Sequence, residues 1–182
     1  MLEVRGFPNS APTLSKSAIS GHLEPFTAQS LAAASKKLHD IGLPAACTAE
    51  RPLSSCFFYE ECVHAVHPCV HPEFDYALQF GAVYCNRFVE NMHQLSLYGQ
   101  NWAESVRGCL QDELAAIIHS AVASGQPPFE SCSRLEEVAF GLHSYCYTLP
   151  GASICPSWSG LSLLDYALIV RTIGGYGPCS AC

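Results

Sequence analysis

The sequence predicts an all-α domain stapled by disulfides, with five to six helices behind a flexible N-terminal lead. Apolar residues recur three and four positions apart along most of the chain, and the sustained alternation typical of a half-buried strand is absent. All eleven cysteines lie at or after Cys47, where they make up about 8% of the residues, a level typical of disulfide scaffolds. We therefore distinguish an N-terminal segment, residues 1–44, from a cysteine-rich helical domain, residues 45–182.

The N-terminal segment is expected to be flexible apart from one candidate helix. Residues 1–26 are rich in proline, serine and glycine, which is typical of a loop. Residues 28–41 carry apolar residues at the spacing of one helix face, namely Leu31, Ala34, Leu38 and Ile41. Gly42 and Pro44 follow and would end this helix.

Two helices are predicted in the first part of the cysteine-rich domain. The first should begin at Ser54 or Ser55, whose hydroxyl can cap it, and end at Pro68, which cannot continue a helix. The second should run from about Tyr76 to Leu97 and break at Gly99. Its apolar side is formed by Phe80, Val83, Tyr84, Phe88 and Met92.

The next helix has the clearest pattern of the chain. Its buried face is predicted to comprise Trp102, Val106, Cys109, Leu110, Leu114, Ile117, Ala121 and Val122. Gly125 stands where a left-handed residue would close the helix, and two prolines follow it. Two further helices are expected over about Glu130–Tyr147 and Leu161–Ile173, before a glycine-rich tail at residues 174–178.

Charge and cysteine content narrow the class of protein. The net charge of −7 argues against binding to nucleic acid, which needs a basic face, and against docking on anionic lipid. Eleven cysteines are typical of an oxidising compartment, so an extracellular, secreted protein is expected. Because the charged start Met1–Pro8 lacks the apolar run of a signal peptide, we expect the true start to lie upstream. No apolar stretch is long enough to predict a membrane span.

The strongest candidate for a metal site is a Cys/His cluster whose spacing suits zinc: Cys62, His64, His67, Cys69 and His71. In an oxidised protein, however, these sulfurs would belong to disulfides, so no metal site is predicted. A nucleophilic cysteine is also disfavoured, because no local signature of a cysteine hydrolase flanks any of the eleven. We therefore expect no enzyme activity and no cofactor. A Cys/His metal-binding or hydrolytic protein stays open as an alternative.

The spacing of the later cysteines resembles that of a known family. The pattern comprises Cys85-x2-Phe88-x10-Gly99-x2-Trp102-x6-Cys109, then Cys132-x13-Cys146 with Tyr147, and then Cys155. It is similar to the stanniocalcins, secreted helical hormones that form disulfide-linked dimers and also have eleven cysteines. The upstream series, Cys47, Cys56, Cys62 and Cys69, resembles the closely spaced first four cysteines of that family. The resemblance covers about residues 45–155.

The resemblance implies a disulfide pattern and a function. The implied intrachain pairs are Cys47–Cys62, Cys56–Cys85, Cys69–Cys132, Cys109–Cys146 and Cys155–Cys179. The odd cysteine, Cys182, would join two copies into a homodimer, and its place after the glycine-rich tail suits that role. The implied function is hormone-like signalling through contact with an unknown extracellular protein, with a family role in calcium and phosphate homeostasis. A small secreted effector or defence protein on the same scaffold is the alternative.

Overall fold

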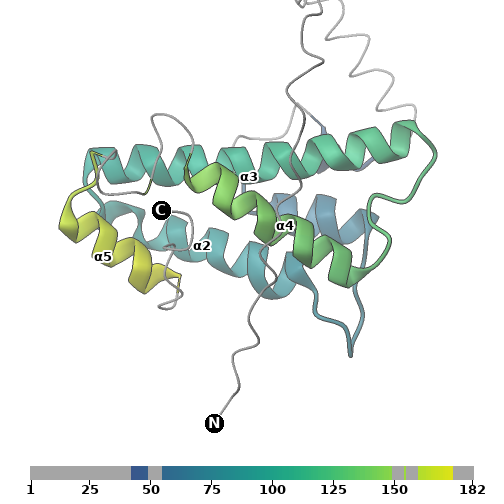
Figure 1. The fold of residues 1–182 in the computed structure, drawn as a ribbon, viewed down its shortest axis with the longest axis horizontal. Coiled ribbons are helices and arrows are strands. Elements are labelled where there is room, and N and C mark those ends of the chain that lie inside the picture. Colours follow the sequence, from purple (N-terminus) through teal and green to yellow (C-terminus); the bar gives the residue numbers. More distant parts are fainter. Residues whose placement is uncertain (1–41, 49–54, 149–153, 155–159, 174–182) are drawn as a thin grey trace, which may run out of the picture.

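All regular elements in the described part of the chain are helical (Figure 1). The computed structural model describes residues 42–48, 55–148, 154 and 160–173. The predicted all-α fold stapled by disulfides is therefore confirmed. The candidate helix at 28–41 and the glycine-rich tail lie outside the described residues.

One long helix organises the arrangement. Figure 1 shows α3 running along the length of the molecule, with α4 crossing in front of α2 and α5 near the end where α3 begins. The short leading elements are the 3-10 turn η1 (Ala45–Cys47) and the π-helix η2 (Tyr59–His64), which lies within helical residues 57–66. A second π-helix leads directly into the next helix and a 3-10 turn: η3 (Tyr76–Gly81), α2 (Ala82–Asn91) and η4 (Met92–Gln94). The remaining helices are α3 (Leu97–Ala123), α4 (Cys132–Tyr147) and α5 (Leu163–Thr172).

The prediction that a helix breaks at Gly99 was wrong. The backbone becomes extended at Leu95 and Ser96, and α3 begins at Leu97, so Gly99 lies in its first turn. Ser96 sets this start, because its hydroxyl accepts a hydrogen bond of 3.1 Å from the Gly99 N–H. The serine cap, rather than the glycine three residues later, therefore divides the two helices.

The expected end of α3 is confirmed. Gly125 adopts a positive φ of 67°, which a residue without a Cβ adopts at no steric cost. The Gln126 N–H bonds the Ala121 carbonyl at 2.9 Å, and the Gly125 N–H bonds the Val122 carbonyl at 3.0 Å. This is the hydrogen-bond pattern of a Schellman motif, which satisfies carbonyls left over at a helix end.

A single buried carboxylate joins the starts of α3 and α5. Asp165 is only 1% exposed and accepts hydrogen bonds from the backbone N–H and hydroxyl of Ser96, both at 2.7 Å. It also accepts hydrogen bonds from the hydroxyl and backbone N–H of Ser162, the residue that caps α5. Burial alone would raise the pKa of Asp165, but these hydrogen bonds outweigh it and hold the pKa below its ordinary value. The carboxylate packs so closely that a Cβ on Gly99 would lie 2.7 Å from its Oδ1.

The buried side chains form two clusters, and α3 contributes to both. Its first half packs Trp102, Val106 and Leu110 with residues of α2, α4 and α5. Its second half packs Leu114 and Ile118 with η2, η3 and the first half of α4. The two clusters meet near the middle of α3, beside α2 and the end of α4.

We expect Asp165→Asn to lower the free energy of unfolding by about 2 kcal/mol, because an amide cannot replace a charged acceptor of four hydrogen bonds. The effect should depend on pH. The carboxylate's contribution is complete above the pKa of an unfolded aspartate, about 3.9. It is lost as the pH falls through the lower pKa of the folded state. Urea unfolding at neutral and acidic pH measures both effects.

The matched control is Glu90→Gln, which removes an exposed carboxylate from α2. It should change the stability by no more than about 0.5 kcal/mol. Equal losses in the two variants, or the same acid dependence in Asp165→Asn as in the wild type, would contradict the role of Asp165.

Candidate functional site

Four disulfides hold the described elements together. They are Cys47–Cys62, Cys56–Cys85, Cys69–Cys132 and Cys109–Cys146, with Cα–Cα distances of 4.9, 5.6, 5.8 and 5.8 Å. These pairs agree with four of the five that the resemblance implied. The fifth, Cys155–Cys179, and the odd cysteine, Cys182, lie outside the described residues. The eight described cysteines all pair within the chain, so none of them is available for an interchain bond.

Each bond joins two different elements. Cys47–Cys62 ties η1 to η2, and Cys109–Cys146 ties the middle of α3 to the end of α4. Cys56–Cys85 joins the start of the first helix to α2, and Cys69–Cys132 joins the following loop to the start of α4. Disulfides thus hold α4 at both of its ends and α3 at its middle.

The histidines of the Cys/His cluster do not converge on one point. Cys62 and Cys69 belong to different disulfides, so neither offers a thiolate to a metal. His64 Nδ1 lies 2.6 Å from the Asp75 carboxylate, whereas His67 Nε2 lies 3.9 Å from the sulfur of Cys132. Among the described residues the nearest approach to a metal site is His67 with Cys69 and Cys132, whose two sulfurs are bonded to each other.

The structure instead reveals a cavity that the sequence analysis missed. It has a volume of about 40 Å³ and lies where the two buried clusters meet, between η2, η3, α2, α3 and α4. Its polar lining comes from seven side chains, most of them far apart in the sequence: Tyr59, Tyr76, Tyr84, Trp102, Arg107, His143 and Tyr147. We call it the aromatic cavity.

The two π-helical turns position two of these tyrosines. Tyr59 is the first residue of η2 and Tyr76 the first of η3, and both are almost fully buried. Gly81 at the end of η3 allows the two turns to approach, because a Cβ there would overlap the Tyr59 ring. Turns of the π type are rare and frequently accompany functional sites.

Burial controls the charge of the cavity's titratable groups. It raises the pKa of Tyr147 to about 12 and that of Tyr59 and Tyr76 further, so all three hydroxyls stay protonated. Burial also lowers the pKa of His143, whose Nδ1–H donates to the Ala139 carbonyl at 2.8 Å, and the ring is neutral near pH 7. The cavity therefore presents hydroxyl donors and a neutral imidazole.

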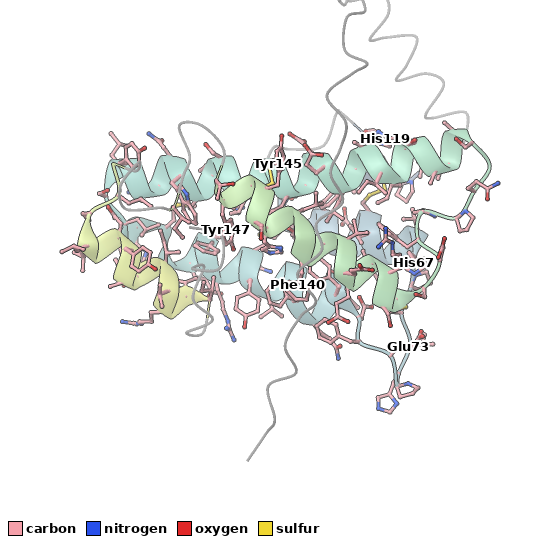
Figure 2. The ribbon with its side chains drawn as sticks, in the orientation of Figure 1. His67, Glu73, His119, Phe140, Tyr145 and Tyr147 are labelled. Carbon is pink, nitrogen blue, oxygen red and sulfur yellow. A yellow bond between two sulfur atoms is a disulfide. The ribbon has the colours of Figure 1, made fainter. Side chains whose placement is uncertain are left out.

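Half-buried rings form the side of the cavity nearest the surface. Phe80, Tyr84, His143 and Tyr147 are each partly exposed, and Phe80 packs against Tyr84 with ring centroids 4.3 Å apart. His143 packs edge-on against Tyr147 at 5.5 Å. Figure 2 shows Tyr147 and Phe140 on one side of α4 and Tyr145 on the other. Of these α4 residues, His143 and Tyr147 line the cavity, whereas Phe140 and Tyr145 do not.

Comparison with known proteins identifies no relative: no family model, curated protein or solved structure matches the chain. None of the helices in the described residues is long and apolar enough to cross a membrane.

Gly81→Ala should destabilise the fold by about 1–3 kcal/mol, because its methyl group would force the Tyr59 ring and its π turn apart. The matched control is Gly141→Ala in α4, where a Cβ meets nothing within 4 Å. That variant should be more stable by about 0.5–1 kcal/mol, the ordinary gain of alanine over glycine in a helix. Thermal unfolding measures both. Two changes of the same sign would contradict the close contact at Gly81.

The oxidised protein should retain no stoichiometric zinc, because the sulfurs beside the histidines are held in disulfides. Elemental analysis after dialysis against zinc tests this. One zinc per chain, lost in a variant that carries both His64→Ala and His67→Ala, would overturn it.

Proposed function

We propose that this chain is a secreted, non-enzymatic signalling protein of the stanniocalcin type, which acts by contact with another extracellular protein. The disulfide pattern is the observation that carries the proposal. Four pairs occur in the arrangement that the resemblance implied, although eight cysteines allow 105 different pairings.

Stability in an extracellular setting supports the proposal. The disulfides close sequence separations of 15 to 63 residues. In the chain-entropy model, loops of this size give about 3–4 kcal/mol of stabilisation each. Such bonds persist in oxidising compartments, and a reducing cytosol would not maintain them.

The joined starts of α3 and α5 supply a surface for protein contact. Leu97, Leu163 and Leu164 are 74%, 86% and 67% exposed, and the Asp165–Ser96 hydrogen bonds hold the two helix starts together. Exposed apolar residues gathered in this way are typical of protein-binding surfaces. We name these three residues the leucine tip and propose that the partner protein binds there.

A covalent homodimer through Cys182 completes the proposal. Eleven cysteines cannot all pair within one chain, and all eight described ones already do. A cysteine left over from the intrachain pairs can bond to its own copy across a two-fold axis. Non-reducing electrophoresis should show a species near twice 19.7 kDa for the wild type and a monomer for Cys182→Ser.

The test is binding of the labelled, oxidised full chain to cultured vertebrate epithelial cells, followed by measurement of calcium and phosphate flux. We expect saturable binding, competition by a vertebrate stanniocalcin and a change in flux. A variant with both Leu163→Asn and Leu164→Asn should bind about tenfold more weakly. Val70→Asn is the matched control: Val70 is 70% exposed but lies in the loop next to Glu73, at the opposite end of the molecule from α5 (Figure 2).

The other outcomes separate the alternatives. Saturable binding that stanniocalcin does not compete would favour an effector or defence protein with its own target. Several titratable thiols per chain in the folded protein would favour the metal-binding or hydrolytic alternative. Absence of any saturable binding would overturn the proposal.

A further inference from the structure

Among the described disulfides, Cys56–Cys85 is the one in which a nitrogen donor contacts each sulfur. The Arg107 guanidinium donates to the Cys56 sulfur at 3.7 Å, and the Gln111 amide donates to the Cys85 sulfur at 4.0 Å. Arg107 and Gln111 lie one turn apart on α3, and both side chains are buried. A hydrogen bond to an ionised sulfur is stronger than one to a neutral sulfur. Both donors therefore favour the two thiolates over the disulfide.

Accessibility also distinguishes this disulfide from the others. Cys56 is partly exposed, whereas both cysteines of Cys47–Cys62 and both of Cys69–Cys132 are buried. The pair Cys109–Cys146 likewise has one partly exposed cysteine, but in the described part of the chain no donor contacts either of its sulfurs. Exchange with an external thiol requires access to a sulfur and stabilisation of the sulfur that leaves. Cys56–Cys85 meets both requirements.

The Gln111 amide is incompletely satisfied while the disulfide is closed. Gln111 is only 1% exposed, and its Oε1 has no hydrogen-bond partner among the described residues. A reduced Cys85 would bring an S–H donor next to this amide. Gln111 Nε2 also donates to the Ser55 carbonyl at 3.0 Å, so it holds the residue next to Cys56 whether or not the disulfide is closed. Opening the bond therefore leaves the two cysteines close together.

We infer that Cys56–Cys85 is a redox-active disulfide that exchanges with an external dithiol. A thiolate of the dithiol attacks the partly exposed Cys56 sulfur, the bond between the two cysteines breaks, and Cys85 leaves as a thiolate that accepts a hydrogen bond from Gln111. The second thiolate of the dithiol then attacks this mixed disulfide. That step forms the disulfide of the reagent and releases the Cys56 thiolate beside Arg107. Two electrons and, through solvent, two protons pass from the dithiol to the two cysteines.

The exchange should leave the fold intact. The other three described disulfides still join their elements, and the Gln111–Ser55 hydrogen bond still links α3 to the start of the first helix. The exchange uses none of the residues of the leucine tip, so it is independent of the proposed signalling function.

Thiol trapping in the oxidised full chain tests this site. The protein is equilibrated at increasing ratios of reduced to oxidised dithiothreitol, the free thiols are alkylated, and mass spectrometry of peptides reports each cysteine. Cys56 and Cys85 should be reduced together, with an equilibrium constant at least about tenfold above that of Cys109–Cys146. The far-ultraviolet circular dichroism should not change. Cys109–Cys146 is the internal control, because it offers a partly exposed cysteine without the donors.

Glutathione, a monothiol, identifies the sulfur that is attacked. After brief exposure and an acid quench, the glutathione adduct should be found on Cys56 and not on Cys85, which is 5% exposed.

Variants of the two donors separate their roles. Arg107→Gln should lower the equilibrium constant for reduction of Cys56–Cys85 about tenfold, since a charge-assisted contact is lost, and Arg107→Lys should restore part of it. Gln111→Leu should slow the formation of the glutathione adduct, because the leaving Cys85 thiolate loses its donor. The constant for Cys109–Cys146 should stay the same in each sample, which a general loss of structure would not allow. Arg171→Gln, in which an exposed arginine of α5 is replaced, is the matched control and should change neither disulfide.

Four results would overturn the inference. The first is reduction of Cys56–Cys85 no more readily than Cys109–Cys146. The second is earlier reduction of Cys69–Cys132, whose Cys132 sulfur lies 3.9 Å from His67 Nε2. The third is an unchanged equilibrium constant in Arg107→Gln, and the fourth is a glutathione adduct on Cys85.

Discussion

Covalent bonds between distant helices are the constraint on which the rest of this structure depends. Only 14% of the residues are charged, and the buried core divides into two clusters instead of one. The four disulfides connect the elements that build these clusters, and the longest closes 63 residues between a loop and the start of α4. Cross-links of this kind reduce the conformational freedom of the unfolded chain. The native state can then tolerate a polar cavity at its centre.

Asp165 links the starts of two helices, as the disulfides link other parts of the helices. Its ionised carboxylate accepts hydrogen bonds from both capping residues, Ser96 of α3 and Ser162 of α5. Asp165 and Ser96 are 69 residues apart in the sequence. This contact fixes where α3 begins and joins the helix start that carries Leu97 to the helix start that carries Leu163 and Leu164. A buried charge is tolerated there because four hydrogen bonds replace the water it has lost.

The aromatic cavity and the leucine tip suggest that the scaffold has two separate sites. The cavity lies between the buried clusters, where two π turns and a glycine set the positions of Tyr59 and Tyr76. The leucine tip lies at the end of the molecule where α3 and α5 start. The two π turns therefore line the same cavity as Trp102 of α3, whose buried indole N–H has no hydrogen-bond partner among the described residues.

The sequence by itself determined the helical class, the end of α3 at Gly125 and, through a resemblance in cysteine spacing, the four disulfides. These features follow from local rules: periodicity, capping and the spacing of one residue type. It did not reveal that Ser96 rather than Gly99 starts α3, because the hydroxyl that caps this helix is held by Asp165, 69 residues away. Nor did it reveal the cavity, whose lining residues come from five separate elements. Only the tertiary structure decides such sites, because burial, pKa shifts and hydrogen-bond satisfaction depend on which side chains meet in space.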